Sequence, residues 1–130
     1  MPPVDDLLAR ARQGWTRLSA AEAYTALAEG ALLVDTRTAV QRARTGDLPG
    51  ALVIDRTVLE WRFDPTSPNR IPEADARPRV VVVCRQGYSS SLAARSLRDL
   101  GLDATDVVDG VEGWIEAGLP LTREPADVRE

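Results

Sequence analysis

An apolar run with no interruption places the strongest constraint on the fold of this 130-residue chain. Four consecutive valines, Val80 to Val83, follow Arg79 and lead directly into Cys84. A strand that is apolar along its whole length is buried on both faces, which is typical of a parallel sheet with helices on either side. The run therefore predicts an interior strand of an α/β domain.

The rest of the chain alternates strand-like and helix-like segments. Further apolar runs predict strands at residues 31–34, 51–54 and 105–108. Helical patterns predict helices at residues 19–29, 38–43, 57–61, 90–100 and 111–117. The first of these helices is marked at both ends, by a capping box from Ser19 to Glu22 and by Gly30. Such alternation indicates an α/β fold with a largely parallel sheet.

The length of the chain fits one compact domain. We expect an N-terminal helical extension at residues 1–14, the domain itself at residues 15–121 and a polar C-terminal tail at residues 122–130. Residues 64–78 contain four prolines and are predicted to form a surface loop, because proline is excluded from helix interiors and central strands.

The composition excludes several classes of catalytic site. The chain has no histidine, all 16 of its basic residues are arginines, and Cys84 is its single cysteine. Histidine-dependent triads and dyads, imidazole metal ligands, lysine Schiff bases and lysine-containing phosphate loops are therefore excluded. One cysteine permits neither an internal disulfide nor a thiolate zinc site. We expect no metal and no cofactor.

The charge and hydropathy of the chain restrict its partners and its location. A formal net charge of −4 argues against binding to nucleic acids or to anionic membranes, because both need an excess of positive charge. No segment has the length of a signal peptide core or of a membrane span. A single free thiol fits a reducing compartment, so we expect a cytoplasmic protein.

The residues after the valine strand have the pattern of a reactive cysteine loop. Cys84 is followed by a short polar loop and then by a helix; the loop consists of Arg85, Gln86, Gly87, Tyr88 and Ser89. Ligands of open α/β sheets bind beyond the carboxyl ends of the strands. Unpaired N–H groups and the helix dipole stabilise an anion at such a helix start, and here the anion is the Cys84 thiolate. We therefore predict that Cys84 is a nucleophile.

Two structural interpretations of the same residues stay open at this point. Free cysteine is among the most buried residue types, so Cys84 can equally be a small core residue at a strand end. One of Ser89, Ser90 and Ser91 is expected to be the N-cap of the helix. Arg85 adds a positive charge beside the thiol, which suits an anionic substrate.

Four segments, in the order found in the family, resemble the signatures of single-domain rhodaneses, which are sulfurtransferases. They are Leu33–Arg37 with an Asp-x-Arg motif, Gly46–Ala51, the loop Cys84–Ser89, and Asp109–Trp114 followed by Gly118–Pro120. The resemblance covers roughly residues 15–121 and implies a three-layer α/β/α fold with a central, mostly parallel sheet of about five strands. Asp47 stands where the family usually has a histidine of its Gly-His-Ile-Pro-Gly-Ala signature.

The resemblance also implies a mechanism. The Cys84 thiolate would take the outer sulfur from thiosulfate or a similar anionic donor, hold it as a persulfide and pass it to cyanide, an external thiol or a protein. The backbone N–H groups of residues 85–89 would stabilise the persulfide, and Arg85 would attract the donor. Asp35 and Arg37 are implied near the loop, either in support of the site or as an ion pair that braces strand and loop. Arg44 either reaches the site or is simply exposed.

Two other functions compete with this one. A rhodanese-like binding or regulatory module, or a persulfide carrier, would do without thiosulfate turnover. Phosphatases and arsenate reductases related to this fold have a loop one residue longer, in which five residues separate the cysteine from an arginine that binds the phosphate oxygens. Counted from Cys84 that position is Ser90, so we expect no phosphatase activity.

Overall fold

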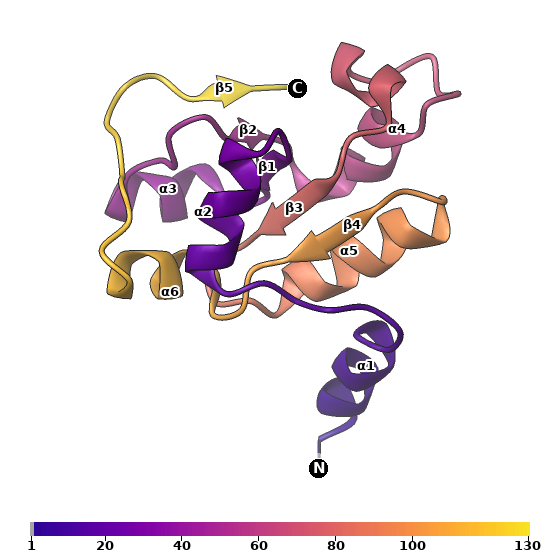
Figure 1. Ribbon diagram of the computed structural model, residues 1–130, viewed down its shortest axis with the longest axis horizontal. Coiled ribbons are helices and arrows are strands. Elements are labelled where there is room, and N and C mark those ends of the chain that lie inside the picture. Colours follow the sequence, from indigo (N-terminus) through magenta and orange to yellow (C-terminus); the bar gives the residue numbers. More distant parts are fainter. Residues whose placement is uncertain (1) are drawn as a thin grey trace.

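The computed structural model, which describes residues 2–130, has a five-stranded sheet in the order β4-β3-β1-β2-β5, and every neighbouring pair is parallel (Figure 1). The strands are β1 (Leu32–Asp35), β2 (Leu52–Val53), β3 (Val80–Val83), β4 (Ala104–Asp106) and β5 (Asp127–Val128). The helices are α1 (Pro3–Ala11), α2 (Ala20–Ala28), α3 (Ala39–Thr45), α4 (Leu59–Phe63), α5 (Ser89–Asp99) and α6 (Gly110–Glu116). Two 3-10 turns are η1 (Arg56–Val58) and η2 (Pro72–Ala76). The predicted α/β class with helices on both faces of the sheet is confirmed.

The sheet is buried on both faces because β3 has a valine at every position. Val80 and Val82 belong to a core formed with α4 and α5, whereas Val81 and Val83 belong to a second core formed with α2 and α6. None of the four is more than 1% exposed. Burial of apolar surface on both sides, at roughly 25 cal/mol per Å², fixes this strand in the interior. Cys84, the residue that follows β3, is therefore attached to a strand that is held firmly in the interior.

Local signals set the helix boundaries close to those predicted from the sequence. The Ser19 hydroxyl accepts a hydrogen bond from the Glu22 amide at 3.1 Å, and the Glu22 carboxylate accepts one from the Ser19 amide at 2.9 Å, which is the predicted capping box. Thr38 and Gln41 form a second capping box at the start of α3. The strands and helices predicted from the sequence differ from the observed ones by no more than two residues at either end.

The C-terminal segment, predicted as a polar tail, contributes the fifth strand of the sheet. β5 pairs in parallel with β2 at one edge. Before β5, Asp47 and Thr122 form an antiparallel bridge through two backbone hydrogen bonds of 2.9 and 2.8 Å. After it, the Arg129 guanidinium makes two hydrogen bonds to Glu73 of η2, which lies within the predicted proline-rich loop. β5 has only two residues, both exposed, so no apolar pattern indicates it in the sequence.

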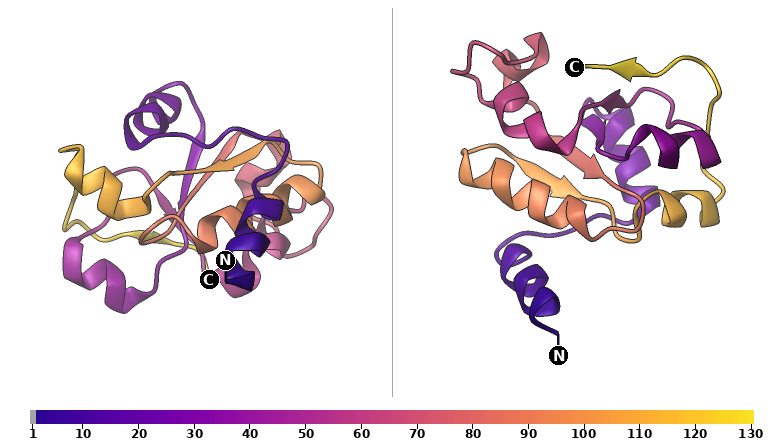
Figure 2. Two further views of the ribbon diagram at one scale, coloured as in Figure 1. Left: turned by 90° about the horizontal axis from the view of Figure 1, so that it is seen from below. Right: turned by 180° about the vertical axis from the view of Figure 1, so that it is seen from behind.

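The N-terminal helix α1 packs beside α5 and projects from one end of the molecule (Figures 1 and 2). Pro3 at its first turn, with Asp5 and Asp6, gives the helix a favourable start. The Arg95 guanidinium of α5 donates to the carbonyls of Ala11, at 2.9 Å, and of Gln13. The predicted N-terminal extension is therefore docked on the domain, and the chain after α1 runs past the amino end of α5 (Figure 1).

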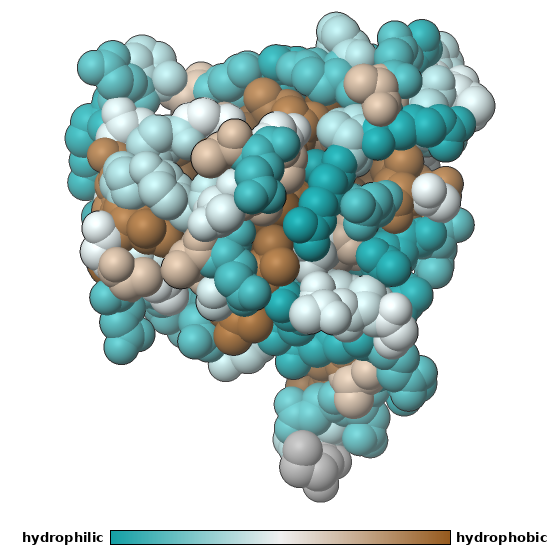
Figure 3. Space-filling view, viewed as in Figure 1, coloured by the Kyte–Doolittle hydropathy of each residue, from teal (hydrophilic) through white to brown (hydrophobic). Residues whose placement is uncertain are grey.

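The face of the molecule drawn in Figure 3 is mostly hydrophilic. Figure 3 shows small apolar patches separated by hydrophilic residues on one face of the molecule. Within residues 2–130, no helix is both long and apolar enough to cross a bilayer.

Candidate active site

The loop at the carboxyl end of β3 surrounds the sulfur of Cys84 with hydrogen-bond donors. The amide nitrogens of Gly87 and Ser90 lie 3.2 and 3.4 Å from Sγ, and both N–H groups point at it. Gly87 adopts a φ of +89°, in the left-handed region that favours glycine, which turns the chain back over the sulfur. The Cys84 side chain is only 6% exposed, at the floor of this loop. The arrangement is an anion cradle of the kind predicted from the sequence.

The carbonyl groups of the same loop are held away from the sulfur. The amides of Val111 and Glu112, in the first turn of α6, donate to the carbonyls of Cys84 at 2.9 Å and Arg85 at 3.1 Å. This close approach requires Gly110, because a Cβ there would lie 2.4 Å from the Cys84 carbonyl oxygen. The N-terminus of α6 therefore fixes the loop from one side and leaves its N–H groups free for the thiolate.

Two opposing influences set the pKa of Cys84. Burial raises it, because the thiolate loses hydration. Hydrogen bonds from the hydroxyls of Ser90 and Ser89 and from the backbone N–H groups of Ser90 and Gly87 lower it and outweigh burial, so this pKa lies below the usual value of a thiol. The Ser90 hydroxyl lies 2.7 Å from the Asp106 carboxylate and has one proton to share, whereas the two amides point at the sulfur alone. The backbone amides of Gly87 and Ser90 are therefore the donors that serve the sulfur alone.

A buried carboxylate behind the loop was not predicted from the sequence. Asp106, the last residue of β4, is fully buried and accepts hydrogen bonds from the hydroxyls of Ser90, at 2.7 Å, and Ser91, at 2.8 Å. The Arg17 guanidinium pairs with it at 2.7 Å. Each partner lies far from Asp106 in the sequence, so residue spacing does not predict that these side chains interact. The position of Asp106 at the end of a strand is the one sequence feature that indicates a role near the site.

The serines after the loop take roles different from the predicted one. α5 begins at Ser89, and the N-cap position is occupied by Tyr88, whose side chain makes no capping hydrogen bond. The expectation that one of the three serines is the N-cap is therefore wrong, because Cys84 Sγ accepts the Ser90 amide in place of a capping hydroxyl. The Tyr88 ring is 61% exposed and lies on the outside of the loop.

Arg85 and Gln86 both contact one carboxylate of α6. Glu112 lies 3.3 Å from the Arg85 guanidinium, and it accepts a hydrogen bond from the Gln86 side-chain amide at 3.2 Å. The Arg85 side chain is 52% exposed, so water screens this ion pair. The positive charge predicted beside the thiol is present, and Glu112 partly neutralises it.

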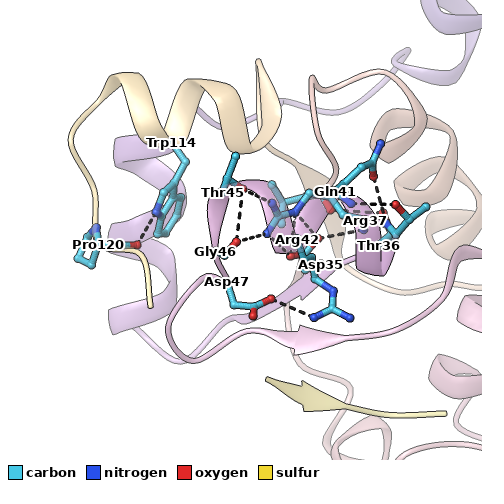
Figure 4. A network of polar contacts seen from close by, with 12 residues as sticks. Asp35, Thr36, Arg37, Gln41, Arg42, Thr45, Gly46, Asp47, Trp114 and Pro120 are labelled. Atoms are coloured by element: carbon cyan, nitrogen blue, oxygen red, sulfur yellow. Dashed lines mark hydrogen bonds and ion pairs between the residues drawn. The ribbon is translucent and has the colours of Figure 1, made fainter. Parts of the chain in front are cut away.

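Asp35 and Arg37 form a buried ion pair that braces the end of β1. Their closest side-chain atoms are 2.8 Å apart, and both side chains are about 1% exposed (Figure 4). Arg37 also donates to the Thr45 hydroxyl at 2.8 Å and to the Gly46 carbonyl at 3.0 Å. Asp35 lies in register with Val83 of β3. Within residues 2–130 no hydrogen bond joins this pair to the Cys84 loop, which favours the bracing role.

Three arginines line a hollow beside the Cys84 loop. We call it the arginine-lined hollow; its lining residues are Arg37, Gln41, Arg44, Thr45, Arg85, Val111, Glu112 and Ile115. Its lining comes from α3, from α6 and from Arg85, the residue after Cys84, so it lies at the same end of the sheet as Cys84. Arg44 thus belongs to the surroundings of the loop rather than to a remote surface. Arg37 is buried and paired with Asp35, whereas Arg44 and Arg85 are exposed and give the hollow a charge that suits a small anion.

Asp47, at the position of the family's histidine, has a structural role. Its carboxylate pairs with the Arg42 guanidinium at 3.1 Å (Figure 4), and its backbone carries the bridge to Thr122. Within the C-terminal signature segment, the buried Trp114 donates its indole N–H to the Pro120 carbonyl at 2.8 Å. Within residues 2–130, no cluster of three potential metal ligands is present.

Comparison with known proteins agrees with this geometry. A family model described as "Rhodanese-like domain" matches residues 19–117. The chain is 29% identical to a protein of unknown function from Rhodopseudomonas palustris, described as a possible tyrosine phosphatase, over 92% of this chain and 93% of that one, with a TM-score of 0.84.

Two further solved structures share the fold. A rhodanese-related protein from Thermoplasma volcanium is 24% identical over 85% of this chain and all of that one, with a TM-score of 0.67. A thiosulfate sulfurtransferase from Pseudomonas aeruginosa is 24% identical, with a TM-score of 0.75; the match covers 98% of this chain and 24% of that longer one. The match of the family model over residues 19–117 shows that the chain belongs to the rhodanese-like family.

Proposed function

We propose that the protein is a thiosulfate sulfurtransferase that carries sulfur as a persulfide on Cys84. The observation that carries this proposal is the pair of N–H groups, from Gly87 and Ser90, directed at Cys84 Sγ. They favour the thiolate over the thiol and would equally favour a persulfide anion at the same place. The thiolate is the nucleophilic form of cysteine, so no histidine is needed to activate it.

The reaction needs no net proton transfer in its first half. The Cys84 thiolate attacks the outer sulfur of thiosulfate, the bond between the two sulfur atoms of thiosulfate breaks, and sulfite leaves with the electron pair. In the second half an external thiolate or cyanide attacks the outer sulfur of the persulfide, and the Cys84 thiolate is the leaving group. Because the chain has one cysteine, the acceptor comes from outside. The reducing cytoplasm, rich in small thiols, suits this second step.

The arginine-lined hollow supplies the approach for the anionic donor. Arg85 and Arg44 present guanidinium groups beside the loop, and the donor is a dianion. Opposite charge at this distance raises the local donor concentration and orients it toward the loop. We assign the capture of the donor to these two side chains and the chemical step to Cys84.

Intact-mass measurement after incubation with thiosulfate tests the proposal. Wild-type protein is expected to gain the mass of one sulfur atom and to lose it again on addition of cyanide or a small thiol. Cys84→Ser is expected to gain nothing, since a hydroxyl of ordinary pKa does not attack sulfur under these conditions. If the wild-type mass does not change, the chain is a binding or regulatory module rather than an enzyme of this class.

Because one similar structure is described as a possible tyrosine phosphatase, hydrolysis of phosphate esters is the activity to test as a control. A phosphatase loop of this type needs a guanidinium at the position held by Ser90, which is buried and hydrogen-bonded to Asp106. We expect no Cys84-dependent hydrolysis of aryl phosphates. Hydrolysis that disappears in Cys84→Ser would overturn the assignment of the loop to sulfur.

A further inference from the structure

The carbonyl of Gly87 accepts hydrogen bonds from two guanidinium groups that come from the N-terminal part of the chain. Arg12, directly after α1, donates through Nη2 at 2.9 Å, and Arg17, in the connection to α2, donates through Nη2 at 2.9 Å. Both residues precede the segment that matches the family model, which begins at residue 19. A peptide group of the sulfur-binding loop is thus held by residues outside the matched domain.

The two arginines are also tied to the start of α5. Arg12 donates through Nε to the Ser91 hydroxyl at 2.9 Å, and Ser91 in turn donates to Asp106. Arg17 makes a second hydrogen bond to the Asp106 carboxylate, at 3.0 Å. Gly87, Ser91 and Asp106 are therefore joined through Arg12 and Arg17 into one network directly behind the loop.

The charge of this network favours an anion at the sulfur. Arg17 pairs with the Asp106 carboxylate, whereas Arg12 bonds the Ser91 hydroxyl and the Gly87 carbonyl, so this network carries one net positive charge while Cys84 is a thiol. A thiolate or persulfide anion compensates that charge. A carbonyl bonded by two cations is also fixed in direction, away from the sulfur, so the loop keeps the conformation in which its N–H groups converge.

We infer that Arg12 and Arg17 are positioning residues of the active site, which lock the Gly87 peptide and stabilise the anionic form of Cys84 from behind the loop. The inference rests on the proposed role of Cys84 as a thiolate nucleophile. If Arg12 acts in this way, α1, which brings Arg12 to the loop, belongs to the active site. Family membership does not imply this, because the contacts come from outside the matched segment.

Other charged groups face the loop from different sides and have to be kept constant in any test. They are Glu112 and Arg85 at the mouth, Asp106 behind the loop, Asp109, whose backbone lies against Gly87, and the Asp35–Arg37 pair at the end of β1. Arg12→Gln leaves all of these in place. It also leaves Arg17 on Asp106, so it does not strand a buried carboxylate, as Arg17→Gln would.

Alkylation of Cys84 by iodoacetamide as a function of pH tests the inference without any sulfur donor. In Arg12→Gln we expect alkylation at pH 6 to be about threefold to tenfold slower than in wild type, with equal rates above pH 10, where every thiol is ionised. A merely structural opening of the loop would instead change the rate at every pH. Arg10→Gln, an exposed change on the same helix, is the matched control and is expected to behave like wild type.

Two further measurements complete the test. Arg12→Lys keeps the charge and one donor, and is expected to recover part of the rate at pH 6. Thermal unfolding checks that each variant is folded, and Arg12→Gln costs little here because its side chain is only half-buried. A folded Arg12→Gln protein with the wild-type pH profile would overturn the inference. It would leave the proposed function intact, because persulfide formation is measured separately.

Discussion

At the scale of single residues, Glu112 sets the charge of the arginine-lined hollow, where we propose that the sulfur donor binds. Its carboxylate lies against both Arg85 and Gln86, although only Arg85 carries charge. The pair is half exposed on both sides, so its strength is limited by water. The residue therefore weakens the attraction for an anion without removing it.

Glu112→Gln is expected to improve capture of thiosulfate. The amide keeps a hydrogen-bonding group for its neighbours but releases the Arg85 charge, so the KM for thiosulfate should fall by about twofold to threefold while kcat stays unchanged. Steady-state sulfur transfer to cyanide measures both constants. Glu116→Gln changes the net charge equally on the same helix, away from the hollow, and should leave KM unaltered. An equal fall in both variants would point to net charge instead of Arg85.

Much of the residue-scale chemistry was predictable from the sequence, and the missing part has a physical cause. The valine run and the glycine-containing loop were enough to predict Cys84 at the end of a buried strand. Asp106 and Arg12 were not predictable, because their contacts join residues far apart in the chain and leave no local pattern. Sequence spacing reports neighbours along a strand or helix, whereas these groups meet only after the sheet has formed.

At the scale of elements, the short edge strand β5 depends on ion pairs more than on apolar contact. Arg129 follows it and binds Glu73 through both carboxylate oxygens, at 2.9 and 2.7 Å, and Asp127 at 2.7 Å. Hydrogen bonds from Arg129 hold the pKa of Glu73 and of Asp127 below their usual values. The stabilisation is therefore present above the ordinary carboxyl pKa and is lost as the pH falls through the lowered one.

Arg129→Ala is expected to release β5 from the sheet. Hydrogen exchange should show lost protection of residues 127–129 at pH 7, and little difference between variant and wild type once the pH is below the lowered pKa values of Glu73 and Asp127, where both carboxylates are protonated. The free energy of unfolding should fall by about 1 kcal/mol or less, because the ion pairs are partly exposed. Arg79→Ala, an exposed arginine outside this group, is the control. Unchanged protection in Arg129→Ala would mean that the backbone pairing with β2 alone holds the strand.

At the scale of the whole molecule, the single thiol means that the chain can form no internal disulfide and has no second cysteine to accept sulfur from Cys84. Its one cysteine is also nearly buried, which hinders contact between the thiols of two copies. The burial of Cys84 in its loop therefore also hinders disulfide formation between two copies of the chain.

Mild peroxide treatment is expected to produce no disulfide-linked dimer. Cys84 should be oxidised on its own, to a sulfenic acid that a thiol reverses and then to higher oxides. A non-reducing gel after blocking with an alkylating agent should show no covalent dimer. Glu124→Cys adds an exposed thiol and is expected to give dimers under the same conditions. Dimers of the wild-type protein that are absent in Cys84→Ser would contradict this expectation.

The depth of the sulfur also limits the shape of any acceptor. Cys84 lies on the floor of a loop whose outer residues, Tyr88 and Arg85, stand more than half exposed above it. A persulfide extends the reach by only about 2 Å, the length of one sulfur–sulfur bond. A broad, flat protein surface with a cysteine level with it would meet the loop before the two sulfurs touch. Under the proposed function we therefore expect the recipient to be a slender molecule, or a cysteine on a narrow, protruding stretch of chain.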